Sequence, residues 1–300
     1  MTSMLTDTVW ERLLRERAER PSAFVEALAG RRRRPLMRGD RRLLIVAADH
    51  TARAIVAADG DPFALANRRE LLDRLTRILA RPGVDGLLAS ADIVEELAWL
   101  GALDDKLVFG TMNRGGYLGA SWGLDDRMTA YDAEHVARLG LDGGKVLLRI
   151  EHTDRGVATT LTQVVEQMRL LEERGLVCIV EPLPYVIGDD GQPALDRSTD
   201  RLDKVVSIAA GLGANSMLTW LKLPAWTSLT TLGGATTMPI LLLGGDPGPQ
   251  IETTFAEWEA ALQVPNVIGL VAGRPLLFPH ARSVEDVADR AARIVHGARR

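Results

Sequence analysis

The chain has 300 residues, of which 46% are hydrophobic and 25% are charged, the balance of an ordinary globular protein. Its single cysteine excludes an intramolecular disulfide and a cysteine-based zinc cage. The apolar runs are too short to span a bilayer, and the charged N-terminus lacks the apolar core of a secretory signal. We therefore expect a cytoplasmic protein with no membrane partner.

The basic residues carry more information than the net charge of −4. The run Arg31–Arg34 could form a nucleic-acid-binding arm, but Pro35 and nearby acidic residues favour a solvated helix end, and we expect no nucleic-acid partner. Only four of the 36 basic residues are lysines, namely Lys106, Lys145, Lys204 and Lys222. A lysine within an apolar run therefore stands out, because lysine can lose its proton and arginine cannot.

Strand-like and helical segments alternate along the chain. Two helical segments, at about 5–18 and 20–33, precede a first apolar run at 43–48. Seven more short apolar runs lie near 86–90, 107–111, 146–150, 176–180, 216–221, 240–243 and 267–271. Segments with helical periodicity lie between or after these runs, for example at 71–79, 157–173, 199–212 and 284–294. Eight such units predict an α/β fold, a single (β/α)8 barrel over residues 41–300 with an N-terminal helical extension over 1–40.

Two long loops follow predicted strands, and no G-x-G-x-x-G motif of a dinucleotide-binding fold follows the first one. The loops are Thr51–Asn67 and Met112–Met128, and the second is rich in glycine. Such a loop is expected to be either a lid over the substrate or a packing and oligomer contact. We expect a homo-oligomer, in which the N-terminal helices either cap the bottom of the barrel or contact another subunit.

Lys222 is the strongest single signal of chemistry. It follows a largely apolar run, and a buried amine with a lowered pKa can attack a carbonyl to form a Schiff base. The alternative is a lysine that extends from the strand end to solvent. Lys145 and Arg149 lie on one face of the fourth strand, so an inward orientation would bring two more cations into the barrel.

Carboxylates are also predicted at strand ends. Glu181 follows the fifth apolar run and could move a proton to or from a substrate hydroxyl, or form a structural ion pair with Lys145 or Arg149. Asp49 could hold substrate hydroxyls and relay protons, or cap the following segment. Tyr185 could assist as an acid.

Glycines and an arginine after the last two strands predict a phosphate site. Gly244, Gly245 and Gly273 leave backbone N–H groups available, and Arg274 adds a guanidinium suited to phosphate oxygens. The five histidines lack metal-ligand spacing, so we expect no metal and no cofactor, although Glu151, His152 and Asp154 offer a minor divalent-ion alternative. Cys178 is predicted to be a core thiol.

The order of these residues resembles the class I (Schiff-base) aldolase superfamily. The resembling features are Asp49-His50, Lys145, Glu181, Lys222 in W-L-K-L-P, and then the Gly-Gly and Gly-Arg pairs. The resemblance covers about residues 43–278. It is closest to tagatose-bisphosphate aldolase, to archaeal-type fructose-bisphosphate aldolase, and to an actinobacterial aldolase-like barrel family found beside myo-inositol catabolism genes.

This resemblance implies a retro-aldol enzyme with Lys222 as the Schiff-base lysine. It further implies that Lys145 tunes Lys222 and that Arg274 binds phosphate. Glu181 matches the strand-five glutamate of the tagatose-type enzymes, and Asp49 matches the strand-one aspartate that orients the substrate or helps imine formation. The sequence departs from the archaeal-type pattern at Glu151-His152, which replace a tyrosine, and at Asp246 after the two glycines.

We therefore expect an aldolase for a phosphorylated keto-sugar, with 2-deoxy-5-keto-gluconate 6-phosphate as the first substrate candidate. Arg149 and His50 are expected as further substrate or phosphate contacts. The alternatives are a deoxyribose-phosphate or sulfo-sugar-phosphate aldolase, a thiolase-like transferase with the same lysine, and a non-catalytic sugar-phosphate-binding barrel.

Overall fold

The computed structural model describes residues 4–113, 124–225, 233–245 and 250–297. The strands are β1 (Leu43–Ala48), β2 (Gly86–Ala89), β3 (Leu107–Thr111), β4 (Gly143–Ile150), β5 (Val177–Ile187), β6 (Pro193–Leu195), β7 (Thr219–Pro224), β8 (Ile240–Leu243) and β9 (Val267–Ala272). The helices are α1 (Asp7–Glu19), α2 (Ser22–Gly30), α3 (Arg68–Leu79), α4 (Ala91–Trp99), α5 (Ala133–Arg138), α6 (Gly156–Glu172), α7 (Thr199–Ala210), α9 (Ile251–Ala261), α10 (Arg274–Leu277) and α11 (Val284–Gly297). None of the helices in these ranges is long and apolar enough to cross a membrane.

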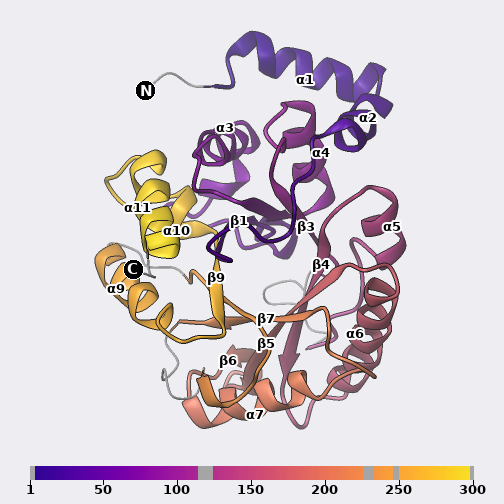
Figure 1. Ribbon diagram of the computed structural model, residues 1–300, viewed down its shortest axis with the longest axis vertical. Coiled ribbons are helices and arrows are strands. Elements are labelled where there is room, and N and C mark those ends of the chain that lie inside the picture. The colour runs from indigo at the N-terminus through magenta and orange to yellow at the C-terminus, as the bar shows by residue number, and fades with distance from the viewer. Residues whose placement is uncertain (1–3, 114–123, 226–232, 246–249, 298–300) are drawn as a thin grey trace.

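In the described part of the chain, eight parallel strands close into a barrel surrounded by helices (Figure 1). The order around the barrel is β1-β2-β3-β4-β5-β7-β8-β9, and β9 pairs with β1 to complete the ring. The predicted (β/α)8 barrel is therefore confirmed, and each predicted apolar run overlaps one barrel strand.

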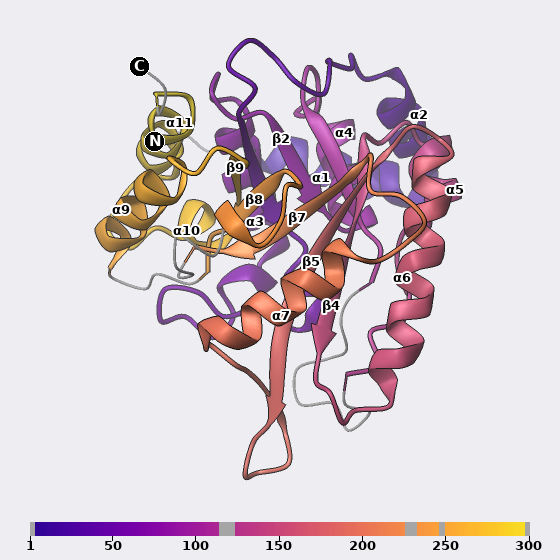
Figure 2. The same cartoon turned by 60° about the horizontal axis from the view of Figure 1, so that its bottom comes forward.

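The β5–β6 hairpin was not expected from the sequence. Pro182 and Pro184 suggest a strand that ends at residue 180, because proline interrupts the hydrogen bonding of a strand. Instead β5 stays paired with β4 through Pro184 and then turns back into the antiparallel β6. The hairpin projects beyond the barrel (Figure 2). Glu181 consequently lies within a strand, not at its end.

Alternation along the strands decides which side chains enter the barrel. One apolar cluster fills the interior and includes Ile45 and Ala47 of β1, Ile179 of β5 and Trp220 of β7. The residues between them belong to a larger cluster that contains the helix side chains. Because side chains alternate with a period of two, the residues two positions beyond Ala47, Ile179 and Trp220 also face inward.

The arginine run after α2 closes the N-terminal end of the barrel. Arg31 Nη2 lies 3.1 Å from Asp142 Oδ2, and Arg34 Nη1 lies 2.5 Å from Asp85 Oδ1. Both arginines are buried, and Met37 just beyond them packs against the interior cluster. The expectation of a solvated helix end is therefore wrong for Arg31 and Arg34, because the barrel bottom offers a buried carboxylate to each.

We expect Arg34→Met to lower the free energy of unfolding by about 3–5 kcal/mol, since it leaves Asp85 without its buried guanidinium partner. Asp85 Oδ2 also accepts a hydrogen bond from the Leu44 backbone N–H at 2.8 Å. Loss of the ion pair therefore also affects a carboxylate that holds the backbone of β1. Urea denaturation followed by circular dichroism measures the effect. Arg32→Met, at an exposed position of the same run, is the matched control and should change stability by less than about 0.5 kcal/mol. Equal effects of the two variants would contradict this role.

The helices α1 and α2 lie on the outside of the barrel beside α3 and α4 (Figure 1). Phe24 of α2 stacks on Trp99 of α4 with ring centroids 6.0 Å apart. The backbone N–H of Leu5 donates to Asp73 Oδ1 of α3 at 3.1 Å. In the described residues it is thus the segment after α2, not the helices themselves, that covers the barrel bottom. The boundary between the extension and the barrel at residue 40 stays a prediction.

His296, at the end of α11, contacts residues at the bottom of the barrel. Its Nδ1 lies 2.6 Å from Asp40 Oδ2 and its Nε2 lies 3.0 Å from the Gly83 carbonyl oxygen. Burial disfavours the charged ring, but Asp85 and Asp40 outweigh burial and raise the pKa of His296 to about 9. Because both ring nitrogens face acceptors, the ring donates from both and is protonated at neutral pH.

This raised pKa predicts a pH-dependent stability contribution. The contribution is complete below the unfolded-state histidine pKa of about 6.5 and disappears as the pH rises through 9. We expect His296→Gln to lower the thermal midpoint by several degrees at pH 6 and by much less at pH 10. Scanning calorimetry at both pH values measures the difference. A deficit that is the same at both values would show that the ring acts through packing alone.

Candidate active site

Four buried charged side chains form a continuous chain of ion pairs inside the barrel. Lys222 Nζ of β7 lies 3.0 Å from Glu181 Oε1 of β5, and Glu181 Oε2 lies 2.6 Å from Lys145 Nζ of β4. Lys145 Nζ lies 3.1 Å from Oδ2 of Asp49, which directly follows β1. Each of the four side chains is at most 8% exposed. The structure thus brings together all four residues predicted to be catalytic.

The two lysines differ in their protonation energetics. Burial lowers the pKa of Lys222, and Lys145 lowers it further, while Glu181 and Asp49 only partly oppose this. For Lys145 burial acts in the same direction, but Asp49 and Glu181 together outweigh it and raise its pKa. Lys222 is therefore the amine that loses its proton more readily, and Lys145 remains the permanent cation of the cluster.

The carboxylates are held in their charged form. Burial alone would raise the pKa of Glu181, but Lys145 and Lys222 lower it to about 2. The same two lysines hold the pKa of Asp49 well below its usual range, although burial acts in the opposite direction. The expected ion pair between Glu181 and Lys145 is present, and the second oxygen of Glu181 reaches Lys222 as well.

A cavity of about 390 Å³ lies at the carboxyl ends of the strands, and Lys222 and Glu181 line it. Tyr185 of β5 lines the same cavity. Lys145 and Asp49 belong to the ion-pair chain behind these residues. A ligand in the cavity therefore meets the amine of Lys222, which is the lysine with the lowered pKa.

The four residues predicted to bind phosphate also line this cavity, namely Gly244, Gly245, Gly273 and Arg274. Gly245 has a φ of +64°, a backbone conformation that favours glycine. The loop with Asp246 lies outside the described residues, as do residues 114–123 of the proposed lid. The three glycines and Arg274 therefore line the same cavity as Lys222.

Gly273 also makes room for His50. A Cβ at Gly273 would lie 2.2 Å from His50 Cε1, closer than any side chain tolerates. Burial lowers the pKa of His50 to about 4, and the cations Arg274 and Lys222 act in the same direction. His50 lines the cavity as a neutral ring. Sequence reasoning assigned Gly273 to phosphate alone and missed this steric role.

Arg149 faces the interior, as the alternation on β4 requires, but it is engaged by another residue. Its Nε lies 2.9 Å from Asp126 Oδ2, and its guanidinium lies over the Tyr185 ring at 5.2 Å. This contact helps to position the Tyr185 ring. A direct contact of Arg149 with a substrate stays a prediction. Asp126 belongs to the long loop after β3 and is fully buried, which composition alone does not indicate.

The carboxylates of the divalent-ion alternative cap local turns. Glu151 Oε2 accepts hydrogen bonds from the backbone and the hydroxyl of Thr153, and Asp154 Oδ1 accepts from the Gly156 N–H. In the described ranges no group of three or more His, Cys, Asp and Glu side chains is arranged to hold a metal ion.

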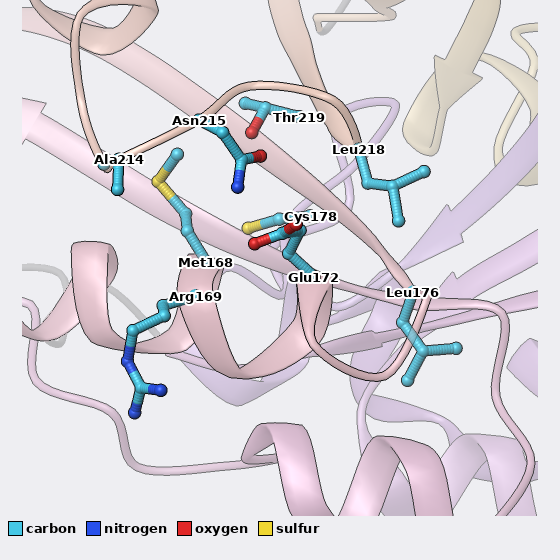
Figure 3. Close-up of a pocket in the computed structure, with 10 residues that line it drawn as sticks. Met168, Arg169, Glu172, Leu176, Cys178, Ala214, Asn215, Leu218 and Thr219 are labelled. Atoms are coloured by element: carbon cyan, nitrogen blue, oxygen red, sulfur yellow. The ribbon is translucent and has the colours of Figure 1, made fainter.

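A second, much smaller pocket lies near the amino ends of β5 and β7 (Figure 3). Its volume of about 20 Å³ admits little more than a water molecule. Cys178 lines it, and burial raises the pKa of this thiol to about 12. A thiol with this pKa is a poor nucleophile at neutral pH, in agreement with its predicted core role.

Several cavity residues were missed by sequence reasoning. They come from the segment after β1, from β6 and the residues just after it, and from α9, and include Arg53, Ile55, Leu195, Arg197, Thr254 and Trp258. None belongs to a motif, and the hairpin itself was not predicted. Only the closure of the barrel brings these segments around Lys222.

Residues 41–292 match the sequence profile of the Cgl0159-like family. The chain belongs to this family. The crystal structure of Cgl0159 from Corynebacterium glutamicum is 44% identical, with 99% of each chain covered and a TM-score of 0.95. No curated protein sequence matched the chain.

The Cgl0159-like fold also resembles solved aldolases. An archaeal fructose 1,6-bisphosphate aldolase is 18% identical, covers 91% of this chain and 99% of its own, and has a TM-score of 0.65. A fructose-bisphosphate aldolase from Slackia heliotrinireducens is 16% identical, covers 92% and 89%, and has a TM-score of 0.62. At these identities the similarity establishes a shared (β/α)8-barrel fold and no more.

Proposed function

We propose that this protein is a class I aldolase that cleaves a phosphorylated keto-sugar through a Schiff base on Lys222. The observation that carries the proposal is the cavity-lining amine of Lys222, whose pKa is lowered and which contacts Glu181 at 3.0 Å. A neutral amine beside a carboxylate supplies both the nucleophile and the proton acceptor of a retro-aldol reaction.

The reaction begins with attack of the Lys222 amine on the substrate ketone. The carbinolamine loses water to give an iminium ion, and the β-hydroxyl then transfers its proton to Glu181, directly or through Tyr185. As the carbon–carbon bond breaks, its electron pair neutralises the iminium, leaving an enamine and an aldehyde. Protonation of the enamine and hydrolysis by water release the ketone product and free Lys222.

The ion pairs explain how Glu181 can accept this proton although its resting pKa is about 2. Lys222 is one of the two cations that lower this pKa. Conversion of the iminium to a neutral enamine removes that positive charge during bond cleavage, so the proton affinity of Glu181 rises along the step. Lys145 keeps Glu181 in place throughout, since it contacts the other carboxylate oxygen.

Substrate placement is assigned to the other residues of the site. Arg274 and the amides after β8 and β9 hold the phosphate, and Asp49 keeps Lys145 charged and oriented. The first substrate candidate is 2-deoxy-5-keto-gluconate 6-phosphate, which places the enzyme in myo-inositol catabolism and rests on family resemblance.

Borohydride trapping followed by peptide mass mapping tests the proposal. The protein is incubated with dihydroxyacetone phosphate or pyruvate, reduced, and digested. We expect a stable adduct on Lys222, and none on Lys204, which is exposed on α7. An adduct on Lys145 would exchange the roles of the two lysines. Absence of any adduct together with tight phosphosugar binding would indicate a non-catalytic binding barrel.

A further inference from the structure

Arg53 is a cation of the cavity wall that has no protein counterion among the described residues. It lies at the end of the single helical turn Thr51–Arg53 that follows β1, and it is half buried. Within the described ranges, its buried Nε–H has no hydrogen-bond acceptor. By contrast, Arg149, Arg31 and Arg34 each contact a buried carboxylate. A partly desolvated guanidinium without an anion is costly, and a bound anion removes that cost.

The charge of Arg53 shifts the pKa values of ionisable groups inside the barrel mouth. It lowers the pKa of His50, after burial and together with Arg274 and Lys222. It also opposes the charged form of Lys145, although Asp49 and Glu181 dominate there. The guanidinium is thus within electrostatic reach of the catalytic cluster.

The cavity as a whole carries more positive than negative charge. Its described lining contains Arg53, Arg197 and Arg274, against the exposed Glu257, while Lys222 and Glu181 form an ion pair with each other. A phosphate monoester carries roughly −1.5 to −2 charges, and the proposed function assigns it to Arg274 and the glycine amides. The guanidinium of Arg53 then remains for another anionic group.

We propose that Arg53 binds a second anionic group of the substrate, a carboxylate or a second phosphate, so that the enzyme selects keto-sugars with two acidic groups. This inference takes the identity of the reaction from the proposed function. The binding of a ligand with two anionic groups does not depend on that function. Arg53 is a specificity residue that makes no bond to the reacting carbon atoms.

Calorimetric titration of the Lys222→Met protein tests the inference without imine formation. The ligands are dihydroxyacetone phosphate, with one anionic group, and fructose 1,6-bisphosphate and 2-keto-3-deoxy-6-phosphogluconate, with two. We expect an added Arg53→Gln substitution to weaken the two-anion ligands by roughly 10- to 100-fold. Dihydroxyacetone phosphate should change by less than about twofold, since its phosphate is held by Arg274 and the glycine loops.

Two further variants separate a specific contact from general attraction. Arg197→Gln removes the same charge from an exposed position of the same cavity, and we expect a much smaller loss than for Arg53→Gln. Arg53→Lys keeps the charge and should restore part of the affinity. A larger loss of affinity for fructose 1,6-bisphosphate would show that Arg53 binds a phosphate. A larger loss for 2-keto-3-deoxy-6-phosphogluconate would show that it binds a carboxylate.

An equal loss for all three ligands would overturn the inference, because Arg53 would then share the first phosphate, and so would the absence of any loss. The two proposals fail separately. Arg53-dependent binding without any borohydride adduct in the wild-type protein would remove the aldolase assignment and leave the ligand class. Adducts on Lys222 with no dependence on Arg53 would do the reverse.

Discussion

The Lys222→Met variant is expected to lose retro-aldol cleavage by roughly four orders of magnitude or more in kcat, as loss of a covalent nucleophile does in other enzymes. Methionine has a similar length but no amine, so neither carbinolamine nor iminium can form. Release of the aldehyde product from a phosphorylated keto-sugar, followed with a coupled dehydrogenase, measures the loss. Borohydride adducts should disappear together with activity.

The fold of this variant should persist, because Glu181 keeps its 2.6 Å contact with Lys145. A thermal midpoint near that of the wild-type protein, and retained binding of phosphosugars, would show that the loss is chemical. Lys222→Arg keeps the charge without a usable nucleophile and should be equally inactive. The matched control is Lys204→Met on the exposed face of α7, with activity within about twofold of wild type. Turnover by Lys222→Met within tenfold of wild type would exclude the Schiff-base assignment.

Lys145→Met is expected to change both the free energy of unfolding and the pH dependence of activity. The substitution leaves Asp49 and Glu181, two buried carboxylates, with Lys222 as their one remaining lysine in the cluster. Removal of a buried counterion lowers the free energy of unfolding by about 3–5 kcal/mol. It also raises the pKa of Lys222, because Lys145 is one of the groups that lower it.

The consequence for catalysis has a definite sign. Lys222 must be neutral to attack, so a higher pKa moves the acid limb of the kcat/KM profile to higher pH and reduces activity at neutral pH by roughly 100-fold or more. Lys145→Arg keeps a cation in the cluster and should restore most of the profile. An acid limb that stays in place in Lys145→Met, measured above the pH of any unfolding, would show that Lys145 does not tune Lys222.

The sequence by itself determined the barrel fold and the parallel direction of its strands. Eight apolar runs separated by amphipathic segments leave a parallel sheet covered by helices as the one arrangement that buries both faces of each strand. Lys145, Glu181 and Lys222 could also be selected in advance, because ionisable groups inside apolar runs must be paired or must have shifted pKa values. Both inferences use local periodicity and the cost of burying charge, which need no knowledge of the fold.

Only the tertiary structure decided the relations between distant segments. It places Lys222 on the cavity and Lys145 in the ion-pair chain behind it, although both lysines occupy apolar strands. It also buries Arg31 against Asp142, 111 positions away along the chain, and Arg34 against Asp85, 51 positions away. The position of Arg53 at the barrel mouth likewise depends on closure between β1 and β9. A side chain's partner across the barrel is set by strand order and register, and neither is encoded in the local pattern around that residue.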